Sequence, residues 1–392
     1  MRDRNADIVI AGAGCAGLAL AYWLTRLGGD DLEIVIIDPT LRDPPKKLWS
    51  FWGDVPEPAR GLVAQSWTRM TLSFPEWTRT EALSGARYHT VRSEHYVRSL
   101  VDRLTRRPNV RFVEERVANI SDLGPGRGAL VETDTGTHWG AQVFQSCMPL
   151  SRRPVPSHAL KQHFGGWEIK TEQPQPGSNT VTLMDFSHSP VSEIAFHYVL
   201  PLTRTRRLVE YTVFSPNVAD RAVYDAAVRA YIDRTVVGPW RVVQTEYGVI
   251  PMQASAPTQR FGTNVWNLGA MGGMSKASTG YTFLRSQRQA QHLATTLLER
   301  GAPTPLPRSP MRFALYDALF LRALRSGGRL GRSLFSSLFA RRRFADVLSF
   351  LDEQTTPLEE LRLVAALPVG SFLAAVARPT QPLLPPLQAI HT

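Results

Sequence analysis

The feature that most constrains this chain is an apolar strand near its beginning that turns sharply into a helix. Residues 7–11 are Asp-Ile-Val-Ile-Ala, and Gly12, Gly14 and Gly17 follow in a Gly-x-Gly-x-x-Gly pattern. The first glycine of such a pattern permits a tight turn, the second lets the backbone approach a pyrophosphate, and the third lets the helix pack on the strand. The helix N-terminus then faces the phosphate charge. The chain is therefore expected to open with a dinucleotide-binding βαβ unit.

A second strand strengthens this interpretation. Residues 33–37 form the apolar run Glu-Ile-Val-Ile-Ile, which ends at Asp38. An acid about 20 residues beyond the glycines, at the end of the second strand, is placed to bind the ribose of a dinucleotide. Without that acid, the glycines also fit a turn that binds nothing. Together they predict a cofactor site formed by Gly12, Gly14, Gly17 and Asp38.

A second glycine-rich segment lies far downstream. The strand-like run 264–268 leads into it, and a helix is predicted after it, over residues 281–299. Its glycines are Gly269, Gly272, Gly273 and Gly280. Two such loops suit a two-part cofactor, with one loop for the adenylate pyrophosphate and the other for the rest. This favours FAD over NAD and predicts a discontinuous cofactor domain, residues 1–150 and 260–302.

The middle segment, residues 151–259, alternates apolar and polar residues as antiparallel strands do. Three runs are expected to be strands, at 180–186, 193–200 and 207–214. In the third run, alternation places Glu210 on an apolar stripe. This acid is either ion-paired at the surface or buried in an apolar cavity, where desolvation raises its pKa and keeps it protonated near neutrality. Asp185, which ends the first run, raises the same question.

The last segment, residues 303–392, has a helical pattern in which apolar residues are interleaved with arginines. Residues 333–343 place four large apolar side chains before the triplet Arg341 to Arg343. Such helices either pack on a core or lie at a membrane surface, where basic residues attract anionic lipids. The net charge of +11 suits a membrane surface, nucleic acid or an arginine-rich proteome. Because no nucleic-acid-reading module is recognisable, we expect no nucleic-acid partner.

Cysteine content and hydropathy argue against other classes. Cys15 and Cys147 are the two cysteines of the chain, and they lack any paired spacing, so neither a disulfide framework nor a metal site is expected. No run of about 20 apolar residues occurs. The apolar N-terminal stretch is explained by its strand and helix rather than by an export signal. We therefore expect a cytoplasmic protein without a membrane span.

Together these motifs resemble one family over nearly the whole chain. An aromatic run at residues 48–53 fits either core packing or a wall for an extended apolar ligand. With the first glycines and Asp38, the marks of the resemblance are residues 49–51, 162–169, 184–186, 198–201, 210–212 and 269–280. They resemble the flavoprotein lycopene β-cyclases of bacteria, relatives of the plant lycopene cyclases. The resemblance implies an α/β fold with a Rossmann-like FAD-binding domain of the aromatic-hydroxylase and glutathione-reductase type, an antiparallel β substrate domain and a helical C-terminal region.

The resemblance also implies an activity. Members of that family bind FAD noncovalently, need it reduced, with NAD(P)H as the electron source, and cyclise the ends of lycopene or related linear carotenes to β-ionone rings without net redox change. The acid matching Glu210 is the one they are thought to use, and we expect Asp185 to orient it or to hold a proton. Either Glu210 or the flavin delivers the proton. We expect a lycopene β-cyclase, an isomerase, peripherally associated with the inner membrane, with the membrane surface and other carotenoid-pathway enzymes as partners.

The sequence departs from related families at two places. Plant members carry two adjacent acids before the threonine, whereas Tyr211 follows Glu210 here, so no role is transferred to a second acid. Residues 143–147 replace the Asp-x-Arg ending of related flavoproteins. Two alternatives stay open: an FAD-dependent reductase or hydroxylase acting on an isoprenoid or aromatic substrate, and a non-catalytic carotenoid-binding flavoprotein. Gly269-Ala270 stands where aromatic hydroxylases carry Gly-Asp, which speaks against a hydroxylase.

Overall fold

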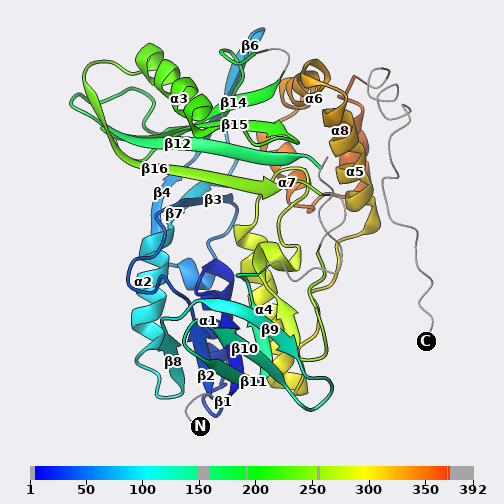
Figure 1. The fold of residues 1–392 in the computed structure, drawn as a ribbon. Coiled ribbons are helices and arrows are strands. Elements are labelled where there is room, and N and C mark those ends of the chain that lie inside the picture. Colours follow the sequence, from blue (N-terminus) through cyan, green and yellow to red (C-terminus); the bar gives the residue numbers. More distant parts are fainter. Residues whose placement is uncertain (1–4, 149–158, 191–192, 254–256, 369, 371–392) are drawn as a thin grey trace.

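The strands of this protein form two large sheets joined by a small one. The computed structural model describes residues 5–148, 159–190, 193–253, 257–368 and 370. Within these residues there are two seven-stranded sheets and one three-stranded sheet. The two large sheets lie at opposite ends of the molecule, and helices α5 to α8 stand beside the second one (Figure 1).

The first sheet contains the cofactor-binding unit that the glycines predict. Its spatial order is β8 (Val110–Val113), β2 (Ile34–Ile37), β1 (Asn5–Ala11), β11 (Thr137–Gln145), β10 (Ala129–Thr133) and β9 (Val117–Asp122), with β17 (Val265–Asn267) also paired to β11. Strands β8, β2, β1, β11 and β17 are parallel, so their carboxyl ends meet at one edge.

Both faces of this sheet are covered, which explains the continuous apolar runs of its central strands. Ile8 and Ile10 of β1 pack against the helices α1 (Cys15–Arg26), α2 (Ser93–Leu104) and α4 (Phe283–Arg300). Val9 belongs to a separate core on the other face, together with side chains of β9 and β10. The predicted α/β class with a Rossmann-like unit is confirmed.

The second sheet is nearly all antiparallel. Its spatial order is β16 (Trp240–Pro251), β12 (Lys161–Thr171), β15 (Arg206–Ser215), β14 (Ile194–Pro201), β13 (Thr180–Asp185), β5 (Arg69–Phe74) and β6 (Trp77–Ala82). The one parallel pair is β13 with β5. The sequence-based domain boundary places residues 69–82 in the unit 1–150, whereas their pairing places them in this sheet.

Strand β15 shows how alternation sorts side chains between the two faces of the second sheet. Its odd-numbered residues pack against α3 (Arg221–Thr235) and are Val209, Tyr211 and Val213. Leu208 and Phe214 belong to the core on the opposite face. That core is completed by α5 (Met311–Arg325), α6 (Gly328–Arg341), α7 (Phe344–Leu351) and α8 (Pro357–Val364). Glu210 therefore lies between the sheet and the C-terminal helices, as an acid on an apolar stripe would.

The third sheet links the two cores. It consists of β3 (Leu48–Trp52), β7 (Tyr88–Arg92) and β4 (Val63–Trp67), and the short helix η2 (Glu57–Ala59) lies between β3 and β4 in sequence. The aromatic run of β3 is divided between the cores: Phe51 packs with the first, and Trp52 packs with the second. Core packing is therefore confirmed for both side chains, whereas the wall for an extended apolar ligand stays a prediction.

The C-terminal helices face inward more than the sequence pattern suggests. In α6 the four large apolar side chains of residues 333–343 are buried, namely Leu334, Phe335, Leu338 and Phe339. This part of α6 therefore does not present its apolar side to a membrane. Residues 371–392, the end of the predicted helical segment, lie outside the described residues. In the part of the chain that the structure describes, no helix has the length and apolarity to cross a bilayer.

Candidate active site

The turn between β1 and α1 has the geometry of a pyrophosphate cradle. Gly12 has φ of +109°, a region that favours glycine. A Cβ at Gly17 would lie 2.0 Å from the carbonyl oxygen of Gly12, so only glycine lets α1 pack this closely. At Gly14 a Cβ would meet no described atom within 4 Å, because it would point into open space at the start of α1. The three glycines thus lie where the dinucleotide motif needs them.

Asp38 lies beside this turn, directly after β2. Its Oδ2 accepts a hydrogen bond of 2.8 Å from the backbone N–H of Ala13. Its Oδ1 accepts hydrogen bonds from the backbone N–H of Thr40 at 2.8 Å and from the Thr40 hydroxyl at 2.6 Å. The carboxylate is thereby fixed at the carboxyl edge of the sheet, next to Gly12 and Gly14. The structure brings the four residues predicted for the first loop together.

The second glycine-rich segment reaches the same edge, because β17 pairs with β11, the neighbour of β1. It forms the short helix η3 (Gly269–Gly272), and Gly269 and Gly273 have φ of +56° and +79°. A Cβ at Gly269 would lie 3.2 Å from the Cβ of Ala16 in α1. A Cβ at Gly272 would lie 2.2 Å from the carbonyl oxygen of Asn267. Gly269 therefore lets the second loop pack closely against α1, and Gly272 lets it approach the end of β17.

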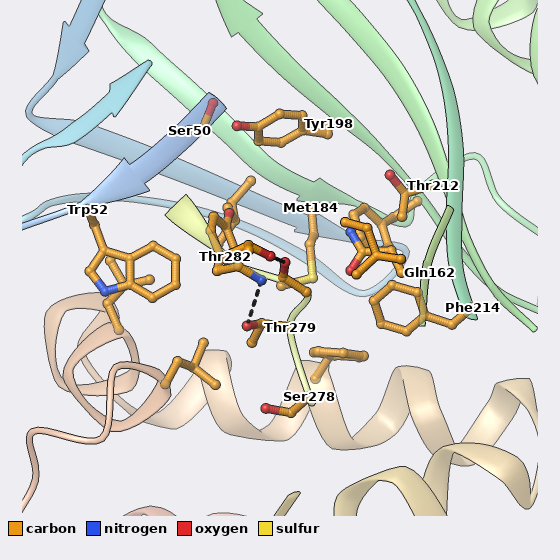
Figure 2. A pocket seen from close by; sticks show the side chains of 18 of the residues that line it. Ser50, Trp52, Gln162, Met184, Tyr198, Thr212, Phe214, Ser278, Thr279 and Thr282 are labelled. Carbon is orange, nitrogen blue, oxygen red and sulfur yellow. Dashed lines mark hydrogen bonds between the residues drawn. The ribbon is translucent and has the colours of Figure 1, made fainter. Parts of the chain in front are cut away.

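A cavity of about 580 Å³ begins at these loops and extends between the second sheet and the C-terminal helices. Figure 2 shows Tyr198 and Thr212 on the sheet side of the cavity and Ser278 on the opposite side. Gly280 of the second glycine-rich segment lines the cavity and has φ of +73°. A Cβ at this position would lie 2.6 Å from Oε1 of Gln162. Much of the remaining lining is apolar and includes Leu319, Phe320, Phe335, Leu338, Phe339 and Phe350.

Glu210 is a buried acid in this apolar cavity, with 8% of its surface exposed. The hydroxyl of Thr212 donates a hydrogen bond of 2.7 Å to its Oε1. Burial and, to a smaller extent, the nearby charge of Glu246 raise the pKa of Glu210 from 4.5 to about 8, although the hydrogen bond from Thr212 opposes the increase. Glu210 therefore holds a proton at neutral pH, which a positioned general acid requires.

Glu246 in β16 is a second buried acid of the cavity, and the sequence analysis missed it. The strand that carries it, β16, begins at Trp240 and is not among the three runs expected in the middle segment. Burial raises the pKa of Glu246 from 4.5 to about 7, and the backbone N–H of Leu48 donates a hydrogen bond of 3.2 Å to its Oε2. The polar run Gln244 to Glu246 hides the strand, because it lacks the apolar alternation that marks one.

Asp185 lies on the other face of the sheet. Its Oδ2 accepts a hydrogen bond of 2.8 Å from the hydroxyl of Tyr231 in α3, and its Oδ1 accepts hydrogen bonds from the backbone N–H and the hydroxyl of Ser187. A register shift in β13 between Thr182 and Asp185 turns the acid away from the cavity. The expectation that Asp185 assists Glu210 is therefore corrected: in the described structure it contacts α3 instead.

Three tyrosines form a neutral wall beside Glu210. The hydroxyl of Tyr88 is hydrogen-bonded to those of Tyr198, at 2.8 Å, and Tyr281, at 2.6 Å. Tyr198 is the register partner of Glu210 on the neighbouring strand. Burial raises the pKa of all three hydroxyls well above 10, so they stay neutral. Trp52 packs edge-on against Tyr281, with ring centroids 4.4 Å apart.

The residues present fit FAD. Three buried polar atoms of the cavity lack a hydrogen-bond partner among the described residues: Nε1 of Trp52, Oε1 of Gln162 and Oγ of Ser278. Buried polar atoms normally have hydrogen-bond partners, so these three atoms mark where a bound molecule would form the missing hydrogen bonds. Cys15 at the start of α1 also lines the cavity. The open space beside Gly14 therefore lies close to the cavity. The site therefore suits a dinucleotide that extends from the first loop to the cavity.

The fold of the chain is similar to the folds of several proteins of known structure. It is similar to a geranylgeranyl bacteriochlorophyll reductase-like protein from Thermoplasma acidophilum (12% identity, 96% of both chains, TM-score 0.60). It is also similar to a flavoprotein/dehydrogenase from Cytophaga hutchinsonii (11% identity, 95% of this chain and 98% of that one, TM-score 0.62). A third is PqsL, a probable FAD-dependent monooxygenase from Pseudomonas aeruginosa (18% identity, 88% of this chain and 100% of that one, TM-score 0.51).

The sequence itself identifies the family. The family described as lycopene cyclase protein matches residues 7–377, and the chain therefore belongs to the lycopene cyclase family. The resemblance noted from the motifs is confirmed. No protein of curated function matches the chain.

Proposed function

We propose that this protein cyclises the ψ-ends of lycopene, or of a related linear carotene, to β-ionone rings, with reduced FAD bound and no net redox change. Family membership supports this activity. The single observation that carries the proposal is a buried Glu210, protonated at neutral pH, in a largely apolar cavity. A proton donor shielded from water is what a cyclisation through carbocations requires.

The reaction consumes and releases one proton for each ring. A proton adds to the terminal trisubstituted alkene and leaves a tertiary carbocation. A neighbouring double bond attacks this cation and closes the ring, and loss of a proton from the ring gives the β-ionone end. The product is an isomer of the substrate. Because each charged species is a carbocation, the apolar lining protects the reaction from water.

We assign the first proton to Glu210. Thr212 donates a hydrogen bond to one carboxyl oxygen, which fixes the side chain toward the cavity. The ring of Tyr198 lies on the adjacent strand at the same register, where an aromatic face attracts a cation. The hydroxyls of Tyr198 and Tyr281 are each hydrogen-bonded to that of Tyr88, so we infer that the wall stabilises positive charge without supplying a nucleophile.

FAD would be held by both glycine-rich loops. The pyrophosphate would lie at Gly14 and the N-terminus of α1, and the ribose would bind Asp38. The segment 269–280 would contact the remainder, and Gln162 and Ser278 offer unpaired polar atoms there. Reduced flavin supplies negative charge that favours a cation in the cavity. NAD(P)H is the electron source that we propose.

The carotene would enter from a membrane at the α5–α8 end of the cavity. Val364 of α8 lines the cavity and is also 36% exposed. Four further large apolar residues are exposed on α5 and α8, namely Met311 and Leu315 of α5 and Leu358 and Leu361 of α8. Arg312 of α5 and Glu360 of α8 form an ion pair of 2.9 Å that joins the two helices. An exposed apolar patch on a basic protein suits an anionic lipid surface. We therefore propose a peripheral association with the inner membrane.

Incubation of the FAD-loaded protein with lycopene in liposomes tests the function. With flavin reduced anaerobically, we expect cyclised carotene of unchanged mass and no stoichiometric consumption of NAD(P)H. Unchanged lycopene, with reduced flavin bound, would favour a carotenoid-binding flavoprotein. A saturated product formed with stoichiometric NAD(P)H, or a hydroxylated product formed in a parallel aerobic reaction, would favour the oxidoreductase alternative.

A further inference from the structure

The cavity contains two buried acids that have no cationic partner in contact. Glu210 and Glu246 each expose 8% of their surface, and no ion pair within 4 Å joins either of them to another group of the described chain. Asp317, the other acid of the lining, differs because it pairs with Lys276 at 2.8 Å. Buried acids are normally paired with a cation or neutralised by a proton. Because neither glutamate contacts a cation, a proton is needed to neutralise at least one of them.

The sheet register places the two acids beside one another on one face. Gly166 of β12 is the register partner of Glu210 in β15 and of Glu246 in β16. Three adjacent strands span about 10 Å, so the outer two side chains approach only where the central residue is small. A Cβ at Gly166 would lie 3.2 Å from Cβ and 3.3 Å from Cγ of Glu210. The side chain of Glu210 therefore occupies the space above the glycine, toward β16.

While no cation occupies this apolar cavity, a negative charge on Glu246 disfavours a second one on Glu210, because like charges repel strongly where water is excluded. The hydrogen bonds favour one distribution of the charge. A backbone N–H donates to Glu246, whereas only the Thr212 hydroxyl donates to Glu210. This amide belongs to Leu48 of β3, which pairs with β7 in the third sheet and not with the strands that carry the two acids. The negative charge is therefore best placed on Glu246 and the proton on Glu210.

We propose that Glu210 and Glu246 form one functional pair, which holds a single proton across Gly166 and takes up another proton when the closed ring is deprotonated. This proposal rests on the proposed cyclisation. The proton leaves the Glu210 carboxyl for the alkene, the ring later loses a proton, and that proton returns to the pair. Protons and charge balance over the cycle, and no oxidant or reductant is needed. Glu246 acts through Glu210, as the residue that keeps the acid protonated.

The other charged groups around the pair do not account for the effect of the Glu246 charge on the pKa of Glu210. Lys47 and Arg92 lower the pKa of Glu246, and Glu168 raises it. Arg92 is already paired with Glu168 through two hydrogen bonds of 2.9 Å and 3.0 Å. Next to Glu210, Tyr198 and Tyr281 stay neutral over the working pH range. The acid that responds to the charge on Glu246 is therefore Glu210.

The pH dependence of Glu246→Gln tests the pair in the FAD-loaded protein. Removing the negative charge should lower the pKa of Glu210, so the alkaline limb of kcat/KM should move to lower pH. A limb displaced by one pH unit lowers the rate above it about tenfold. Asp185→Asn is the matched control, because Asp185 is also 8% exposed but lies on the opposite face, and its limb should stay in place. Glu246→Met serves if the glutamine variant does not fold.

Infrared titration of the carboxylic acid band provides a readout without carotene. In Glu246→Gln the band of Glu210 should disappear at lower pH than in the wild-type protein. If the limb and the band both stay in place, Glu246 is a structural acceptor for the Leu48 amide and the pair is refuted. If the band moves but no carotene is cyclised, the pair stands and the proposed function fails.

Discussion

Replacing Glu210 by glutamine should abolish cyclisation, because the amide keeps the size of the side chain but cannot donate an acidic proton. The structure sets the magnitude. With its pKa raised from 4.5 to about 8, Glu210 is about 90% protonated at pH 7, against about 0.3% for an exposed carboxyl, a gain of roughly 300-fold. A positioned general acid contributes about 10²- to 10⁴-fold. We expect the turnover of Glu210→Gln to fall by at least about 100-fold.

Burial of the ionisable Glu210 side chain lowers the free energy of unfolding at neutral pH. Glu210→Gln should therefore also be more stable than the wild-type protein. The pKa in the folded state lies above the unfolded value, so the stability contribution is fully present below about pH 4.5 and is lost as the pH rises toward about 8. At pH 7 the cost approaches about 3 kcal/mol. Glutamine carries no charge, so Glu210→Gln should unfold with a higher free energy at pH 7, by up to that amount, and the difference should vanish near pH 4.

Denaturant unfolding at both pH values, with product analysis at neutral pH, measures the two effects together. Asp185→Asn is the contrasting variant, because it weakens the hydrogen bond from Tyr231 and should lower the unfolding free energy by about 1 kcal/mol. Wild-type turnover in Glu210→Gln would show that another group supplies the proton. A variant less stable than the wild-type protein at pH 7 would refute the raised pKa.

Two further predictions concern the cofactor and the membrane. Gly14 has an ordinary φ of −81°, so Gly14→Val should fold but lose FAD by absorbance, because its side chain would fill the open space; full flavin occupancy would refute the site. Leu358→Ser with Leu361→Ser should weaken sedimentation with anionic liposomes, whereas Val237→Ser, equally exposed in the loop after α3, should not. Changing Arg341, Arg342 and Arg343 to Glu should also weaken it, by about 1 kcal/mol per charge. Unchanged partitioning would place the membrane contact elsewhere.

Local sequence patterns predict the parts of this fold that depend on neighbouring residues in the chain. The turn from β1 to α1 follows from the spacing of Gly12, Gly14 and Gly17, and Asp38 follows from the end of β2. In β15, a period of two residues places Glu210 and Thr212 together on the cavity face. In each case residues that are close together in the sequence determine the position of the side chain or the turn.

The rest of the site depends on pairing between distant strands. Glu210 and Glu246 lie on the same face of the sheet on either side of Gly166 because both pair with that residue, a relation that no local pattern contains. Asp185 leaves the cavity because a single register shift in β13 overrides the alternation. The helical pattern at residues 333–343 predicts an amphipathic helix, but which side it buries depends on the sheet that it covers.

Deuterium incorporation during turnover tests the central claim most directly, because it follows the proton that Glu210 delivers. In D₂O the exchangeable carboxyl carries deuterium, which adds to the alkene and stays in the ring. The ring loses hydrogen to the acid pair, and the pair exchanges this hydrogen for deuterium from D₂O before the next ring is formed. Mass spectrometry of the carotene formed by the reduced, FAD-loaded protein should show one deuterium gained per ring and no other change. A cyclic product without deuterium, or a product that has gained two hydrogens as the flavin is oxidised, would contradict the account.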